Sequence, residues 1–118
     1  MGIGTSVGRV VKQGDVYWYA FRAPDKRRPV LVLTRSSAIP FLTGVTIAPI
    51  TTTIRGIPSE VILTRDEDGM FDDCAVNTDN IQTVQKVNLG TFITRLPQSR
   101  MRDVRAAIEF SLGFDALL

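Results

Sequence analysis

Residues 26–61 read KRRPVLVLTRSSAIPFLTGVTIAPITTTIRGIPSEV. Two short segments within this stretch, Pro29–Thr34 and Val45–Thr51, are rich in Val, Ile and Thr and are bounded by Gly or Pro, as β-strands are. Three cations precede the first segment, and three threonines end the second. The sequence therefore predicts two strands whose ends carry permanent positive charge and a row of hydroxyls.

Further strand-like segments flank this stretch. In residues 14–21 (GDVYWYAF) both alternating faces are apolar, which predicts a strand buried on both sides or one lining an interface. Residues 60–64 resemble the first two strands, and weaker candidates occupy 75–84 and 90–94. The acidic segment 65–73 is expected to be a solvated turn. Five or six short strands at this spacing predict a small curved barrel rather than a parallel sheet.

The C-terminal part has helical rather than strand periodicity. Pro97 suits a first helical position and Gly113 a stop. Apolar residues recur at helical spacing between them, at Met101, Val104, Ile108 and Leu112. The arginines of this segment are interpreted as a solvated charged face, with RNA contact as the alternative: Arg100, Arg102 and Arg105. The expected fold class is mainly β (α+β), a small SH3-like barrel with a C-terminal α-helix.

Length and composition indicate one globular domain. The chain has 118 residues, of which 44% are hydrophobic and 22% charged. Residues 1–12 are expected to be a flexible N-terminal extension and residues 13–118 the folded domain. No apolar run approaches the roughly 20 residues that cross a bilayer, and the start lacks the long apolar stretch of a secretory signal. A cytoplasmic protein without membrane contact is therefore expected.

The absence of histidine narrows the possible chemistry. It excludes Ser-His-Asp and Cys-His catalysis and any ribonuclease mechanism built on two imidazoles. With Cys74 as the single cysteine, no internal disulfide can form, and neither a metal site nor a cofactor is expected. Residues 1–65 carry a net charge of +6 and residues 66–118 one of −4. The basic half favours a polyanionic partner, although a solvated basic surface would have the same composition.

The first candidate for chemistry is the basic triplet before Pro29. This proline holds Arg28 in an extended conformation, so that its side chain has a defined direction at the start of the strand. A guanidinium is always charged and can bind two phosphate oxygens at once. The alternative is a basic turn that keeps an apolar strand soluble.

The second candidate is the threonine triplet 51–53, followed by Arg55. Hydroxyls and backbone N–H groups at the end of a strand can hold a phosphate. Threonine is also an ordinary strand residue, because β-branching suits the pleat.

The third candidate is the segment 79–83. Asp79 could serve as an acid or base, while Asn80 and Gln82 could bind the edges of bases. An Asp-Asn pair is also common in turns.

Taken in order, these segments resemble the MazF/PemK toxin family, small endoribonucleases of bacterial toxin–antitoxin systems. The separation of 23 residues between Arg28 and Thr51 also matches the family. The resemblance implies an SH3-like barrel that works as a homodimer and cleaves single-stranded RNA at short sequences without metal, leaving a 2′,3′-cyclic phosphate and a 5′-hydroxyl. The matching segments are GDVYWYAF, RRPVLVLT, VTIAPITTTIRGIPSEVIL and DNIQTV.

The resemblance assigns site residues by position. The family's active-site arginine falls on Arg28, its threonine on Thr51, and an aspartate of PemK-type members on Asp79. A further family arginine falls on Asn77, where its role is lost or reassigned. Many members carry a longer first loop with Glu or His, whereas only RAPDKR stands here, as in a mycobacterial-type branch. RNA contacts are expected from Lys26, Arg27, Thr52, Thr53, Arg55, Asn80 and Gln82.

The resemblance also implies partners. A small, acidic, MazE-like antitoxin would cover the RNA groove, and DNA would be reached only indirectly, through the antitoxin's autoregulation. The cleavage sequence does not follow from the family, and mRNA, tRNA and rRNA all remain possible targets. Two other functions remain open on the same barrel: a non-catalytic gyrase poison of the CcdB type and a plain RNA-binding module.

Overall fold

Three strands from the N-terminal half form an antiparallel meander. The computed structural model describes residues 9–22 and 26–117. In it β1 (Asp15–Phe21) pairs with β2 (Lys26–Val32), which pairs with β3 (Gly44–Thr51). The predicted strands are confirmed, but β2 begins three residues earlier than expected. The basic triplet is therefore not in the turn but within the strand, because Lys26 already pairs with Phe21.

Besides β2, β3 pairs with two further strands along its length. Its first half pairs with β6 (Gln82–Gln85), and its end pairs with β5 (Cys74–Asn77). The prediction of one strand over 75–84 is wrong, because a short 3₁₀ turn, η2 (Thr78–Asn80), divides the segment. Pro49, which has no N–H to donate to a ladder, stands between the two paired parts of β3.

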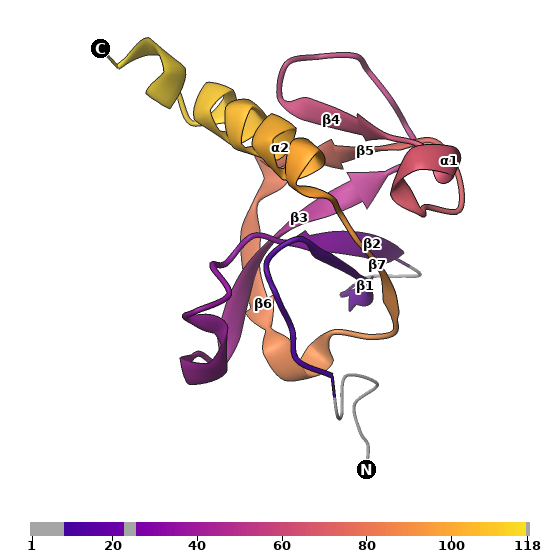
Figure 1. Ribbon diagram of the computed structural model, residues 1–118, viewed down its shortest axis with the longest axis vertical. Helices are drawn as coiled ribbons and strands as arrows, with labels where there is room; N and C mark the ends of the chain where they lie inside the picture. Colours follow the sequence, from indigo (N-terminus) through magenta and orange to yellow (C-terminus); the bar gives the residue numbers. More distant parts are fainter. Residues whose placement is uncertain (1–8, 23–25, 118) are drawn as a thin grey trace.

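The sheet is completed by one strand at each edge. β4 (Glu60–Leu63) pairs with β5, and β7 (Phe92–Arg95) pairs with β1. Within the described ranges there are thus seven strands, in the order β4-β5-β3-β2-β1-β7 with β6 also on β3. All pairings are antiparallel and the sheet curls, as Figure 1 shows. The expected curved sheet is confirmed, with one strand more because 75–84 is divided. Further 3₁₀ turns are η1 (Ile39–Phe41), η3 (Lys86–Asn88) and η4 (Phe114–Ala116).

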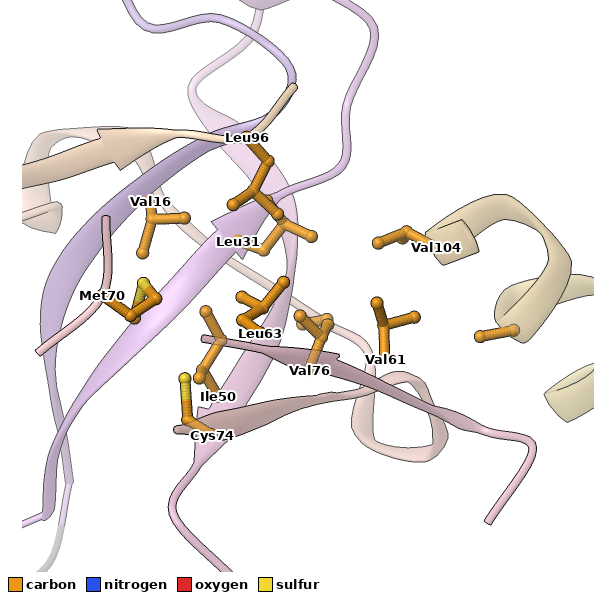
Figure 2. Close-up of a cluster of buried hydrophobic side chains, with 12 residues drawn as sticks. Val16, Leu31, Ile50, Val61, Leu63, Met70, Cys74, Val76, Leu96 and Val104 are labelled. Carbon is orange, nitrogen blue, oxygen red and sulfur yellow. The ribbon is translucent and has the colours of Figure 1, made fainter. Parts of the chain in front are cut away.

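Hydrophobic side chains pack on both faces of the sheet. Val16 of β1 lies in one cluster with residues of β4, β5 and the C-terminal helix (Figure 2), whereas its neighbour Tyr17 lies in a second cluster. The prediction of a first strand buried on both sides therefore holds for these two residues. Farther along β1 it does not, since Ala20 is exposed.

The C-terminal helix α2 (Gln98–Ser111) packs beside β4 (Figure 1), through the buried residues Val104 and Ala107. Pro97 is its N-cap and not its first helical residue. Gly113 follows the helix with φ of 78°, a left-handed conformation suited to glycine, so the predicted stop is confirmed. The predicted apolar stripe is wrong at its end, because the side chain of Leu112 turns to the surface.

The acidic segment is not a solvated turn. Its first residues form the short helix α1 (Arg65–Asp68), which begins because the Thr64 hydroxyl accepts from the Glu67 N–H. Asp68 is buried and accepts a hydrogen bond of 3.0 Å from Arg100 Nε. Arg100, expected on a solvated face, instead ties α2 to α1.

Near the N-terminus, the expected extension falls mostly outside the described residues, at 1–8. Residues 9–12 are described, and Val11 is buried in the second cluster. The boundary at residue 12 stays a prediction. In the part of the chain that the structure describes, no helix has the length and apolar character that spanning a membrane would need.

Candidate active site

A pocket of about 330 Å³ opens where β2, β3 and β5 meet the turn η2. The register that pairs Val30 with Pro49, continued by two residues, sets Arg28 opposite Thr51. The two residues that the sequence separates by 23 positions therefore share one pocket because their strands are antiparallel neighbours. Its lining residues are Arg28, Pro49, Thr51, Thr53, Arg55, Asn77 and Asn80.

The change of strand partner explains the place of η2. On β3, only two residues separate Ile47, which pairs with Gln82, from Ile50, which pairs with Val76. On the other side five residues, 77–81, span the same gap, so part of 77–81 bulges out as a turn. Buried Thr78 anchors it, since its hydroxyl donates to the Ser59 carbonyl at 2.7 Å and its carbonyl accepts from Ser111 Oγ at 3.2 Å. Asn77, which precedes the anchored turn, and Asn80, its last residue, line the pocket.

The pocket is positively charged. Two of its lining residues are arginines, Arg28 and Arg55, and none is a carboxylate. Arg55 uses Nε to bind Glu60 Oε2 at 3.1 Å, which leaves the terminal NH₂ groups of its guanidinium as donors for a ligand. Two guanidiniums on one small concave surface fit an anion with several oxygens, such as a phosphodiester.

The hydroxyl of Thr51 is oriented by its own loop. Thr51 Oγ1 accepts a hydrogen bond of 3.1 Å from the Thr53 N–H. This bond uses a lone pair of the hydroxyl oxygen and not its proton. The Thr51 hydroxyl can therefore donate its proton to an oxygen of a bound ligand. The arrangement thus supplies a neutral donor beside the Arg28 cation.

Glu60 holds the loop that carries Arg55. Its side chain is fully buried and accepts from the backbone N–H groups of Arg55 and Gly56, at 2.9 and 3.0 Å, in addition to the Arg55 side chain. Burial alone would raise the pKa of this carboxyl, but the hydrogen bonds from Arg55 and Gly56 outweigh it and lower the pKa below its ordinary value of 4.5. The charged form is therefore the one that fixes the loop.

A Glu60→Gln variant is expected to be less stable at neutral pH by about 1–3 kcal/mol, because an amide presents a donor to groups that donate. Since the pKa of Glu60 is lowered by folding, its contribution is complete above pH 4.5 and is lost as the pH falls toward the folded-state pKa. Urea denaturation at neutral and at acid pH measures this. The stability difference between the two proteins should shrink on acidification, and a difference independent of pH would contradict the assignment.

Asp79 is not among the residues that line the pocket. Its Oδ2 accepts a hydrogen bond of 2.6 Å from the buried Ser59 hydroxyl, and its N–H donates to Asn77 Oδ1 at 2.9 Å. The residue is exposed, and it stands between Asn77 and Asn80, which do line the pocket. Its expected part in catalysis stays a prediction.

The remaining residues predicted to contact RNA are spread over several places. Thr53, Arg55 and Asn80 line the pocket, whereas Thr52 lines a neighbouring one. The Arg27 guanidinium lies 4.5 Å from the ring centre of Trp18. Gln82 is exposed, and its side-chain amide donates a hydrogen bond to the Asn80 carbonyl. Lys26 belongs to β2, but the structure does not describe its side chain.

Two lining residues, Asn77 and Pro49, were not predicted to be part of the site. Asn77 could have been found, because it stands where the family has an arginine. Pro49 carried a weaker signal, a proline within a strand-like segment, which often marks a break in a ladder. Neither signal says that the residue faces a pocket.

Comparison with known proteins agrees with this architecture. The family model of PemK-like, MazF-like toxins of type II toxin–antitoxin systems matches residues 12–112. The chain is 41% identical to the probable endoribonuclease MazF5 of Mycobacterium tuberculosis, over 85% of this chain and 91% of that protein. It is 42% identical to endoribonuclease MazF3 of the same species, over 77% of this chain and 87% of that protein.

Solved structures show the same fold. The Mycobacterium tuberculosis toxin MazF-mt6 superposes with a TM-score of 0.76 at 37% identity, covering 84% of this chain and 96% of that one. A mycobacterial endoribonuclease in complex with its cognate antitoxin superposes with a TM-score of 0.78 at 26% identity, covering 87% of this chain and 95% of that one.

Proposed function

This chain belongs to the family of PemK-like, MazF-like toxins of type II toxin–antitoxin systems, and we propose that it is an endoribonuclease that cleaves single-stranded RNA at specific sequences without a metal ion. The observation that carries the proposal is the pocket in which Arg28, Arg55 and the Thr51 hydroxyl converge with no carboxylate among the lining residues. A phosphodiester is the anion that such donors suit. The relatives named endoribonucleases cover most of the chain.

The proposed reaction is an in-line attack by the ribose 2′-hydroxyl on the adjacent phosphorus. The bond from phosphorus to the 5′-oxygen breaks, the 2′-proton passes to a base, and the leaving oxygen takes up a proton. The products are a 2′,3′-cyclic phosphate and a 5′-hydroxyl. Arg28 stabilises the charge that develops on the phosphoryl oxygens, and Thr51 donates a hydrogen bond that positions the phosphate.

Asp79 is proposed as the acid or base. A guanidinium stays protonated and cannot accept the 2′-proton, and the chain has no histidine. The short hydrogen bond from Ser59 fixes the direction of the Asp79 carboxylate at the edge of the pocket. RNA would have to bring its 2′-hydroxyl to this edge, directly or through one water.

The partners and the location are proposed on the basis of the family. We propose a homodimer in the cytoplasm, neutralised by a small acidic antitoxin whose carboxylates would meet the cations of the pocket, as a mycobacterial relative is solved with its cognate antitoxin. DNA would be contacted only through that antitoxin. The class of RNA that is cleaved stays open among mRNA, tRNA and rRNA.

The test is incubation of the purified protein with mixed RNA and with the same sequences as DNA, in excess EDTA. RNA should be cut and should carry cyclic phosphate ends, while DNA stays intact because it lacks the 2′-hydroxyl. Cleavage that requires added metal would overturn the proposed chemistry. Salt-sensitive binding with intact RNA would indicate a binding module, and growth arrest that depends on gyrase would indicate a poison of the CcdB type.

A further inference from the structure

An aromatic stack lies on the other face of β2 from Arg28. Trp18 of β1 and Phe71 stack at 5.4 Å between ring centres with an angle of 20° between the planes. The Arg27 guanidinium lies 4.5 Å from the Trp18 ring centre, so a cation also covers this indole. Phe71 nevertheless keeps 57% of its surface exposed. A largely exposed ring at the end of such a stack is a surface on which a further flat ring could lie.

Beside the stack is a small apolar pocket of about 210 Å³. Its buried residues are Ile50, Met70 and Cys74, which Figure 2 shows on the side of the hydrophobic cluster away from Val104 of α2. Burial first, and then the charges of nearby aspartates, raise the pKa of the Cys74 thiol to about 11, so the pocket floor is uncharged. The volume is below the roughly 300–1,000 Å³ of pockets for drug-sized ligands. The remaining lining residues are Trp18, Pro29, Thr51, Thr52, Phe71 and Asp72.

The ring of Phe71 is held in place by its neighbours in the chain. Met70 before it is 4% exposed and inserted in the core, and the Phe71 carbonyl accepts a hydrogen bond of 2.9 Å from Arg65 Nε. Gly69 has φ of 74°, and a Cβ there would lie 2.8 Å from Thr94 Oγ1, so only glycine lets the loop approach β7 this closely. These contacts fix the backbone at Phe71, and the stack with Trp18 orients its ring, which lowers the entropy cost of binding to that ring.

This apolar pocket adjoins the pocket that Arg28 and Thr51 line, named here the phosphate pocket after the anion proposed to bind there. Thr51 lines both pockets and therefore stands between them. The strand alternation of β2 sends Arg28 to the phosphate pocket, and Pro29 lines the apolar one. Because Thr51 belongs to both linings, an RNA strand whose phosphate contacts Thr51 lies at the border of the apolar pocket.

We propose that the pocket formed by Phe71, Trp18 and Thr52 binds one unpaired nucleobase of the RNA next to the scissile phosphate, by stacking on Phe71. The proposal rests on the ribonuclease function proposed above. Stacking on an aromatic ring accepts any base, so discrimination among bases comes from the polar groups at the rim, the Thr51 and Thr52 hydroxyls and the Asp72 carboxylate. Phe71 is in this view a residue for substrate binding and sequence preference, with no part in the bond-breaking step.

The test compares Phe71→Leu and Phe71→Tyr with the wild type on a mixed RNA, by kinetics and by sequencing of the 5′ ends. Loss of one stacked base corresponds to a factor of about 5–150. Phe71→Leu should raise KM by this factor, leave kcat nearly unchanged, and relax the preference at one position beside the cut. Phe71→Tyr, which keeps an aromatic ring, should resemble the wild type. Phe41→Ala is the matched control, since Phe41 is 86% exposed and lines neither pocket.

The possible results distinguish a failure of the base pocket from a failure of the ribonuclease function. If the wild type cleaves RNA and Phe71→Leu has the same KM and the same cleavage sequence, the base pocket is refuted while the ribonuclease function stands. If Phe71→Leu instead changes only the oligomeric state, measured by light scattering, the ring belongs to an interface and the inference fails. A wild type that does not cleave RNA refutes the proposed function itself.

Discussion

An Arg28→Ala variant is expected to lose a factor of about 10²–10³ in kcat for RNA cleavage, the usual effect of removing one preorganised donor from a developing charge. Arg28 is the guanidinium that the β2–β3 register sets opposite Thr51. Its charge acts mainly in the transition state, so KM should change much less than kcat. Single-turnover cleavage of a short RNA containing one site measures both quantities.

Two further variants define what Arg28 contributes. Arg28→Lys keeps the charge but loses the planar fork, so its activity should stay well below that of the wild type. Arg35→Ala is the control, because Arg35 is an exposed arginine that lines neither pocket. If the control lost as much activity as Arg28→Ala, the effect would be a general one of positive charge on RNA binding, and the assignment of Arg28 would be wrong.

An Asp79→Asn variant is expected to lose a factor of about 10²–10⁴ in kcat if Asp79 transfers the proton. The amide oxygen of asparagine can still accept the hydrogen bond from Ser59, so the turn η2 should keep its shape while the ability to take up a proton is lost. The measurement is the same single-turnover assay, with unfolding curves to show that stability is unchanged.

Ser59→Ala separates proton transfer from the shaping of the turn. It removes the hydrogen bond to Asp79 Oδ2 but leaves the carboxylate in place. If Asp79 is the acid or base, this variant should lose less than about tenfold in kcat, since only the orientation of the carboxylate is affected. Equal losses in both variants would mean that Asp79 acts by holding η2, and the proton would then need another acceptor.

The sequence was most reliable where the information is local. Apolar residues on both alternating faces of segment 14–21 predicted β1, short segments rich in Val, Ile and Thr predicted β2 to β4, and helical spacing predicted α2 with its stop at Gly113. Prediction from the sequence failed where the structure of a segment depends on pairing with a strand distant in the sequence. The segment 75–84 has the composition of one strand, yet β3 pairs with its two parts in different registers and extrudes η2.

The acidic segment shows the same limit for charge. Asp66, Glu67 and Asp68 are similar in type, but only Asp68 is buried, and Arg100 from α2 binds both Asp68 and the exposed Glu67. A row of carboxylates in sequence says nothing about which of them a distant cation will pair with.

The sequence by itself determined the curved β-rich fold, the placement of Arg28 beside one strand and of Thr51 at the end of the next, and the absence of imidazole chemistry. These depend on residue type and short-range spacing, which the chain states directly. Only the tertiary structure decided that Asn77 lines the pocket of Arg28 and Thr51, that Asp79 binds Ser59, and that Trp18 and Phe71 stack beside Thr51. Each of these is a contact between elements far apart in the chain, and the register and packing that create it are set by the fold as a whole.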